Sequence, residues 1–184
     1  LRDCSGIRTI CVDLSDPGRV KEVIDDQDVV LGALPSRIGL QTLEAVIRRG
    51  KCYCDISFIP EDAMQLDSLA KKHAATAVVD CGVSPGLSNM MVGHAVSRME
   101  RADRADIYVG GLPKVRHWPY QYKAPFAPSD VIEEYTRPAS IVENGKIIVK
   151  PALSDPELLD FPQVGTLEAF NTDGLRTLLG TVRV

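Results

Sequence analysis

The first hundred residues contain two kinds of apolar segment that follow one another repeatedly. Short apolar runs of strand length occur at residues 7–14, 28–35, 51–56 and 76–80. After each run, the apolar residues are spaced three or four apart, which places them on one face of a helix. These helices are expected to begin near Pro17, Ile38, Pro60 and Leu87. Strand and helix in regular succession predict a parallel sheet with helices packed on both of its faces.

The ends of the four predicted strands are expected to form one edge. The run at 28–35 is continuously apolar, which is typical of a strand buried on both faces, and Gly50 is expected to end the helix that follows it. Right-handed crossovers place the carboxyl ends of parallel strands together. Four places should therefore line up along this edge: Asp13, residues 33–35, residues 55–57 and residues 80–82.

The stretch TAVVDCGVSPGLSN, residues 76–89, contains the most informative of these strand ends. An apolar strand runs into a turn that contains Gly82, Pro85 and Gly86, and a helical pattern follows. In α/β sheets such a turn presents backbone N–H groups and side chains to a ligand. A plain connection between strand and helix is the alternative.

The pattern changes after about residue 101. A short strand is expected at 106–109, and residues 113–128 form a loop with four prolines and four aromatic residues, either an active-site lid or an interface segment. Ser129 or Asp130 is expected to cap a helix that stops before Pro138. Asn144-Gly145 between apolar pairs predicts a hairpin, with a strand at 167–170 and a helix carrying Leu175, Leu178 and Leu179 after it. We therefore expect an incomplete Rossmann-like parallel sheet in residues 1–100 and an α+β region with antiparallel pairing in residues 101–184.

Charge and hydropathy exclude two classes of partner. The 184 residues include 21 Lys and Arg against 25 Asp and Glu, a net charge of −4. This balance has no basic footprint for nucleic acid. No apolar run approaches the roughly 20 residues of a membrane span. We expect neither nucleic acid nor a membrane as partner.

The cysteines do not have the spacing of a metal site. They stand at positions 4, 11, 52, 54 and 81, and the three histidines, at 73, 94 and 117, are scattered. Metal sites usually need two close cysteine pairs or cysteines with nearby histidines. We expect no metal, and instead buried free thiols in a reducing cytoplasm. His94 is expected to be a packed helix residue.

Several motifs together resemble a known family. In chain order they are DVVLGALP, GKCYCDIS, VDCGVSPGLSN, EEYTRPA, an NGK turn and NTDGLRTLL. Their order and spacing over residues 7–180 resemble the saccharopine dehydrogenase-like family, and within it the lysine 6-dehydrogenase type. The resemblance implies an NAD(P)-dependent oxidoreductase that acts on the C–N bond of an amino acid. It also implies a Rossmann domain, and a second domain that closes over the substrate and joins the subunits of a homo-oligomer.

Two features depart from the family pattern. The sequence contains no G-x-G-x-x-G loop for the cofactor pyrophosphate, so this loop is expected upstream of Leu1. Ser84 stands where saccharopine reductases carry an acidic residue in the G-x-D-P-G turn. Serine carries no charge for a substrate ammonium, which makes saccharopine the less expected substrate. A saccharopine or carboxynorspermidine reductase and a non-catalytic nucleotide-binding scaffold remain the alternatives.

The resemblance also implies binding residues along the expected sheet edge. The cofactor, NAD or NADP, would contact Asp13, Ala33, Leu34, Pro35, Ser57, Phe58, Cys81 and Gly82. Within this set, Asp13 would meet the adenosine, while Ser57 and Phe58 would lie beside the nicotinamide. Helix capping by Asp13 and simple termination of the strand at residues 33–35 are the alternatives.

A second set of residues is expected to bind the amino acid: Glu134, Tyr135, Arg137, Asn171, Thr172 and Asp173. An amino-acid substrate always carries a carboxylate, and arginine can bind a carboxylate through two parallel hydrogen bonds. We expect Arg137 to be this partner, with its guanidinium held by Glu134 and Tyr135. A solvated surface helix, and helix capping by residues 171–173, are the alternatives. The sequence identifies no catalytic acid or base.

Overall fold

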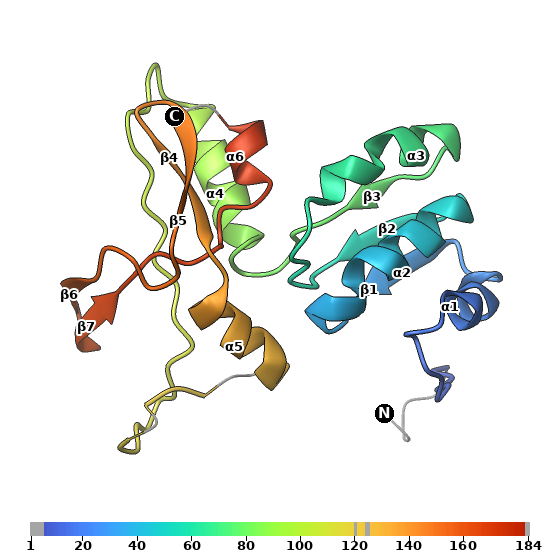
Figure 1. Cartoon of the computed structure of the whole chain (residues 1–184), viewed down its shortest axis with the longest axis horizontal. Coiled ribbons are helices and arrows are strands. Elements are labelled where there is room, and N and C mark those ends of the chain that lie inside the picture. Colours follow the sequence, from blue (N-terminus) through green and yellow to red (C-terminus); the bar gives the residue numbers. More distant parts are fainter. Residues whose placement is uncertain (1–5, 120, 124–125, 183–184) are drawn as a thin grey trace.

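The structure is a computed structural model and describes residues 6–119, 121–123 and 126–182. Two groups of elements lie side by side (Figure 1). One group contains a parallel sheet with α1, α2 and α3, and the other contains α4, α5, α6 and two hairpins. The predicted α/β class with parallel and antiparallel pairing is confirmed. The division near residue 100 stays a prediction.

The parallel sheet consists of β1 (Val29–Gly32), β2 (Cys52–Asp55) and β3 (Ala77–Val78), in the order β1-β2-β3. Val30 pairs with Tyr53, and Cys54 pairs with Val78. All three strands run parallel, so their carboxyl ends meet at one edge, as the sequence predicted. Ile56 N–H donates to the Gly32 carbonyl and Cys81 N–H to the Asp55 carbonyl, which continues the pairing beyond the strands.

Local sequence signals account for the helices around this sheet. α1 (Pro17–Ile24) starts with proline, and the Asp16 side chain accepts a hydrogen bond from Gly18 N–H. α2 (Ser36–Arg48) is followed by Gly50 at a φ of 65°, a left-handed conformation that glycine adopts without strain. A helical segment expected from Pro60 begins later, as the 3-10 turn η1 (Ala63–Leu66) and then α3 (Asp67–Lys72).

The apolar core lies between α1, α2 and one face of the sheet. Its most buried side chains are Val20, Leu43, Val46, Ile47 and Tyr53. Burying each such aliphatic side chain contributes about 1.5–3 kcal/mol. This core holds β1 and β2 in place and thereby fixes where their ends lie.

The other face of the sheet is open, which corrects the prediction of burial on both faces. Leu31 is 78% exposed and Val29 is 59% exposed. Val30 and Gly32 alternate with these side chains along β1 and face the core. No helix among the described residues covers Val29 and Leu31. Cys11 and Cys52 are also exposed, so the expectation of buried thiols is wrong for these two residues, whereas Cys54 and Cys81 are half-buried.

The strand predicted at residues 7–14 is absent. This segment is irregular, and Ile7 and Ile10 are about half exposed. A β-strand needs a hydrogen-bonding partner, and no described strand lies next to this segment. Asp13 accepts hydrogen bonds from the backbone and hydroxyl of Ser15 instead of joining the sheet edge.

The second group of elements begins with α4 (Leu87–Val96) and continues, after a long irregular segment, with α5 (Pro128–Thr136). β4 (Ala139–Glu143) and β5 (Lys146–Lys150) form the predicted hairpin, and Asn144 and Gly145 take φ values of 52° and 72° in its turn. β6 (Glu157–Phe161), which was not predicted, pairs with β7 (Gly165–Ala169). The segment at 106–109 is not a strand, because Tyr108 contacts β6 only through its side chain, with its hydroxyl donating to Glu157 at 2.9 Å.

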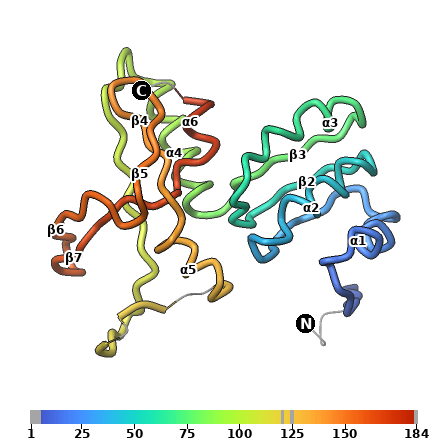
Figure 2. The backbone as a smooth tube through the Cα atoms, viewed as in Figure 1, coloured from blue at the N-terminus to red at the C-terminus, as the bar shows by residue number. Residues whose placement is uncertain are grey.

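The chain returns at its end to the region where β3 joins α4. Figure 2 shows residues 170–182 passing beside α4. Asn89 donates to the Leu175 carbonyl, and α6 (Leu178–Thr181) is shorter than the predicted helix. The turn after β7 is therefore held next to the sheet edge by contacts far apart in sequence.

Candidate functional site

The sheet edge brings together seven of the eight residues predicted to contact a cofactor. Ala33, Leu34 and Pro35 follow β1, Ser57 and Phe58 follow β2, and Cys81 and Gly82 follow β3. The eighth, Asp13, lies in the irregular segment before α1 and not on this edge. Ala33 is exposed and small, and Leu34 and Pro35 are half-buried.

A fully buried carboxylate orients the serine that links two of these strand ends. Asp55 Oδ1 accepts hydrogen bonds from Ser57 N–H at 2.9 Å and from Ser57 Oγ at 2.6 Å. Ser57 Oγ in turn accepts from Leu34 N–H at 2.8 Å. The Ser57 side chain therefore joins the β1 and β2 ends from a buried position. Its predicted place beside a nicotinamide stays a prediction.

Gly32 leaves room for the buried polar groups under this edge. A Cβ atom at Gly32 would collide with the Tyr53 hydroxyl and the Asp55 carboxylate. Burial, and then the charge of Asp55, raise the pKa of Tyr53 well above its usual value, so this hydroxyl stays protonated. The sequence analysis placed Asp55 on the sheet edge but did not include it among the candidate binding residues, although an acidic residue directly after the apolar run CYC is a usable signal.

The turn after β3 is a tight glycine turn, as predicted. Gly86 has a φ of 141°, and a Cβ there would overlap the backbone of Gly82. Leu87 N–H donates to the Gly82 carbonyl at 2.9 Å, which starts α4. Burial and the neighbouring Cys54 raise the pKa of the Cys81 thiol. A protonated thiol is a weak nucleophile, so Cys81 is not poised for covalent chemistry.

Beside this turn the surface is hollowed, with a volume of about 320 Å³. Asp80, Cys81, Asn89 and Thr177 are among its lining residues. Asp80 takes a positive φ of 55°, and its carboxylate accepts a hydrogen bond from Thr177 N–H at 3.1 Å. This bond ties the end of β3 to the final turn of the chain.

Arg137, at the end of α5, lies against Phe58 in the loop that follows β2. Its guanidinium carbon is 4.1 Å from the centre of the Phe58 ring, and the side chain is only 10% exposed. Glu133 Oε2 accepts from Nε at 3.2 Å and also from Nη2. Nη1 is buried without a hydrogen-bond partner, 3.7 Å from the nearest oxygen of Asp173. Nη1 thus makes no hydrogen bond and is paired with Asp173 only through their charges.

The groups that hold Arg137 differ from those expected. Glu133 and not Glu134 contacts it, because residues four apart share a helix face. Glu134 instead accepts a hydrogen bond from Tyr122 at 3.4 Å, and the Tyr135 ring packs against Phe170. Burial raises the pKa of Glu134 and raises the pKa of Tyr122 to about 12.

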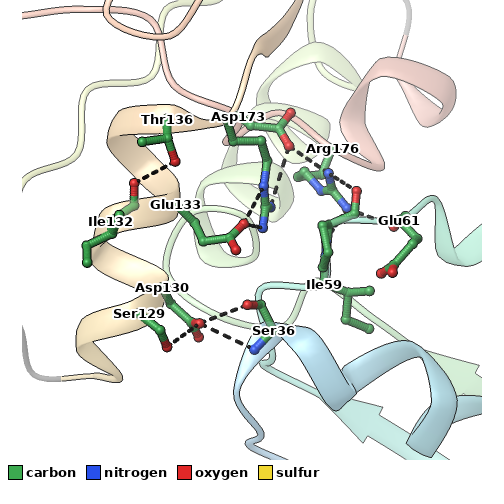
Figure 3. A network of polar contacts seen from close by, with 12 residues as sticks. Ser36, Ile59, Glu61, Ser129, Asp130, Ile132, Glu133, Thr136, Asp173 and Arg176 are labelled. Carbon is green, nitrogen blue, oxygen red and sulfur yellow. Dashed lines mark hydrogen bonds and ion pairs between the residues drawn. The ribbon is translucent and has the colours of Figure 1, made fainter.

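Asp173 connects two buried arginines. Its side chain is 7% exposed and accepts from Arg176 Nη1 at 2.7 Å while lying 3.7 Å from Arg137 Nη1. Arg176 also donates to the carbonyls of residues 59, 60 and 61 in the loop after β2. Figure 3 shows Asp173 and Arg176 between α5 and this loop. Arg176 was not among the predicted binding residues.

The remaining predicted residues have other contacts. Asn171 donates to Ser154 and to the Asp155 carboxylate, and Thr172 accepts from Gly174 N–H through its carbonyl. His94 is exposed, which corrects the expectation of a packed histidine. Within the described residues, no group of three or more His, Cys, Asp or Glu side chains could hold a metal ion. No helix in the described part of the chain has the length and hydropathy to cross a bilayer.

Asp130 caps a helix other than its own. Its Oδ1 accepts from Ser36 Oγ at 2.9 Å and from Ser36 N–H at 3.3 Å, and both residues are buried (Figure 3). α2 begins after Pro35 with no capping side chain of its own, so Asp130 supplies the acceptor and a favourable charge. The prediction that Asp130 or Ser129 caps α5 is wrong, because α5 begins at Pro128 after Ala127.

Comparison with known proteins gives concordant matches. Residues 82–180 match the family model of the saccharopine dehydrogenase C-terminal domain. Saccharopine dehydrogenase [NADP(+), L-glutamate-forming] of Schizosaccharomyces pombe is 23% identical over 150 residues, which cover 77% of this chain and 33% of that protein. The alpha-aminoadipic semialdehyde synthase of Arabidopsis thaliana is 26% identical over 150 residues, or 78% of this chain and 14% of that protein.

A solved structure shares the fold. Apo saccharopine dehydrogenase (L-Glu forming) from Saccharomyces cerevisiae superposes with a TM-score of 0.64 at 19% identity, over 92% of this chain and 40% of that one. The chain spans a third or less of the two curated relatives named above. The family model covers more than half of the chain, and the resemblance of the sequence motifs to the family is confirmed. The lysine 6-dehydrogenase type stays a prediction. This chain belongs to the saccharopine dehydrogenase C-terminal domain family.

Proposed function

We propose that this chain is part of an NAD(P)-dependent oxidoreductase that acts on the C–N bond of an amino acid. Family membership supports this class of reaction. The observation that carries the proposal is the position of Arg137, a buried arginine that stacks on Phe58 in the loop after β2 and whose Nη1 makes no hydrogen bond. The sheet edge next to it is where α/β proteins bind ligands.

Arg137 is the proposed partner of the substrate carboxylate. Stacking on Phe58 fixes the plane of the guanidinium, and a guanidinium held in this way can bind a carboxylate through two parallel hydrogen bonds. The backbone at Ala33, Leu34 and Pro35 fits a cofactor that passes across the strand ends, and NAD(P), when bound, would accept or give the hydride. Binding the carboxylate at Arg137 would orient the carbon that carries nitrogen toward this edge.

Free lysine is our first candidate substrate. Ser84 in the glycine turn lies close to Gly174, where a Cβ atom would be 3.3 Å from the Ser84 hydroxyl. Ser84 stands where saccharopine reductases carry an acidic residue, and its neutral hydroxyl offers no charge for a substrate ammonium, which makes saccharopine the less expected substrate. Saccharopine is the second candidate, which the names of the curated relatives favour. The four free cysteines among the described residues fit a reducing compartment, and we propose a cytoplasmic location.

The proposal is tested in the full-length protein by replacing Arg137 with Lys and with Ala. Loss of a charge-assisted contact whose partner stays buried costs about 2–5 kcal/mol. The Ala variant should therefore lose roughly 30-fold to several thousand-fold in kcat/KM for the amino acid. The Lys variant keeps the charge without the planar fork and should lie between. The KM for the cofactor should change little.

A surface arginine supplies the control. Arg48 makes the same i,i+4 pair with Glu44 but is 51% exposed, so Arg48→Ala should leave both KM values unchanged. Lysine, saccharopine and carboxynorspermidine are compared as substrates in the same assay. An unchanged amino-acid KM in a folded Arg137→Ala variant would reject the assignment. Absence of turnover with every substrate would favour a non-catalytic scaffold.

A further inference from the structure

Two carboxylates contact Arg137, and they differ in how firmly they are held. Asp173 is 7% exposed, is bound by Arg176 at 2.7 Å, and lies 3.7 Å from Arg137 Nη1, beyond hydrogen-bond reach. Glu133 is 39% exposed, and a single oxygen of it accepts from both Nε and Nη2 of Arg137. Glu133 can therefore leave by rotating its own side chain, whereas Asp173 cannot leave without breaking its pair with Arg176.

The charges of the network are already balanced. Arg137 and Arg176 supply two positive charges, and Asp173 and Glu133 supply two negative charges. A substrate carboxylate at Arg137 would add a third negative charge within a few ångströms. Because both arginines are almost buried, that repulsion is only weakly screened by solvent. Departure of Glu133 removes the excess charge and also frees Nε and Nη2 for two parallel hydrogen bonds to the substrate.

We infer that Glu133 is an internal competitor that occupies Arg137 until the substrate carboxylate displaces it. This inference rests on the proposed function, because it takes Arg137 as the carboxylate site. Glu133 then acts as a positioning and specificity residue. It keeps the guanidinium paired in the free protein and lowers the affinity of every ligand that has to replace it. A ligand without a carboxylate has no need to displace it.

Removal of the Glu133 carboxylate should change the strength of substrate binding in opposite directions for an orienting and for a competing role. If Glu133 only oriented Arg137, its removal would weaken substrate binding. If Glu133 competes, its removal strengthens binding. Ion pairs of partly exposed groups are weak, so Glu133→Gln should lower the KM for the amino acid roughly two- to five-fold and raise kcat/KM by a similar factor. Glu133→Asp, which keeps the charge but has a shorter reach, should show a smaller decrease.

The experiment uses the full-length protein with lysine as substrate and cadaverine, which is lysine without its carboxylate, as a competitive ligand. Glu133→Gln should lower the KM for lysine and leave the inhibition constant of cadaverine and the KM of the cofactor unchanged. Glu44→Gln is the matched control, because Glu44 makes the same i,i+4 pair with Arg48 on an exposed surface. This control should change none of the three constants.

The outcomes separate the inference from the function on which it rests. A lysine KM that rises or stays constant in Glu133→Gln, while Arg137→Lys raises it, overturns the competitor role and keeps the carboxylate site. A cadaverine constant that changes as much as the lysine KM also overturns it, because an effect shared with a ligand that has no carboxylate does not act through displacement of Glu133 by a carboxylate. If Arg137→Lys leaves the lysine KM unchanged, the carboxylate site itself is rejected.

Discussion

At the scale of single residues, the buried charges decide how the last turn of the chain meets the sheet edge. Asp173 lies between Arg137 and Arg176, and Arg176 reaches three backbone carbonyls after β2. Arg137 also pairs with Glu133 of α5, and Arg176 pairs with Asp173 three residues away. Removing one member of such a set leaves the others buried and unpaired, which costs far more than the loss of a surface pair.

Asp173→Asn should therefore destabilise the protein strongly. The change leaves two nearly buried guanidiniums without their shared carboxylate, and the expected loss in the free energy of unfolding is about 3 kcal/mol. Asp67→Asn removes an exposed carboxylate that pairs with Lys71, at 45% and 76% exposure, and should cost less than about 0.5 kcal/mol. Chemical unfolding of both variants gives the comparison. Equal losses would contradict the buried-network interpretation.

The stability of the protein should depend on pH through Glu134, in a direction that follows from its raised pKa. Burial raises its pKa in the folded protein, so the folded state binds a proton more tightly than the unfolded state. Its contribution to stability is then fully present below its ordinary pKa and is lost as the pH rises through the folded value. Glu134→Gln should remove this contribution to the loss of stability with rising pH. The midpoint of thermal unfolding, followed from pH 4 to 8, should decline less in the variant than in the wild type.

At the scale of elements, the β4–β5 hairpin shows how turn chemistry fixes register. Asn144 and Gly145 both have positive φ, as a two-residue hairpin turn requires. This turn sets Glu143 opposite Lys146 and Val142 opposite Ile147. As a result Ala139 is fully buried, while Ile147 and Val149 are exposed on the other face.

Gly145→Ala should cost stability through the backbone alone. A Cβ at Gly145 would touch nothing, but its φ of 72° is left-handed, which costs about 1–2 kcal/mol for other residues. Gly180→Ala is the control, because Gly180 lies in α6 with equally open space and no positive φ. That control should be neutral or slightly stabilising. An equal loss in both variants, measured by chemical unfolding, would count against the turn assignment.

At the scale of the whole molecule, two apolar surfaces have no covering element among the described residues. One is the open face of the parallel sheet, with Val29 and Leu31. The other is the exposed face of the β4–β5 hairpin, with Val142, Ile147 and Val149. Contiguous apolar surface of this kind marks an interaction site more often than a free surface.

The 184-residue chain by itself should not bind NAD(P) tightly. The strand ends offer a backbone edge, but the sequence contains no glycine-rich loop for the pyrophosphate. Without that loop most of the affinity for the dinucleotide is missing. Calorimetric titration of the chain with NAD and with NADP gives the test. A dissociation constant in the micromolar range would contradict the expectation.

The full-length protein should form a homo-oligomer through the exposed hairpin face. Ile147 is 60% exposed and Val149 is 67% exposed, and self-complementary apolar patches are the usual basis of symmetric dimers. Ile147→Lys should shift the equilibrium toward the monomer by placing a charge in the contact. Equilibrium sedimentation of the wild type and of the Ile147→Lys variant measures their oligomeric states. A strictly monomeric wild type would refute the proposal.

Short-range signals in the sequence determined most of the elements. Apolar periodicity located β1, α2, β2 and α4, and proline and glycine located helix ends, because these signals depend on residues only a few positions apart. The Asn144-Gly145 pair determined the hairpin for the same reason. The motifs also sufficed to predict the family, since their order along the chain is itself sequence information.

Only the tertiary structure decided which side chains meet. Arg137 was predicted as a binding residue, but its contacts with Phe58 and Asp173 join residues 79 and 36 positions away, and Asp130 bonds to Ser36 across 94 positions. Strand pairing could not be predicted from the sequence either. Residues 7–14 have the composition of a strand, yet a strand forms only where a neighbouring segment supplies hydrogen bonds. Pairing and burial depend on what the folded chain brings alongside a segment, and the segment's own residues do not specify that.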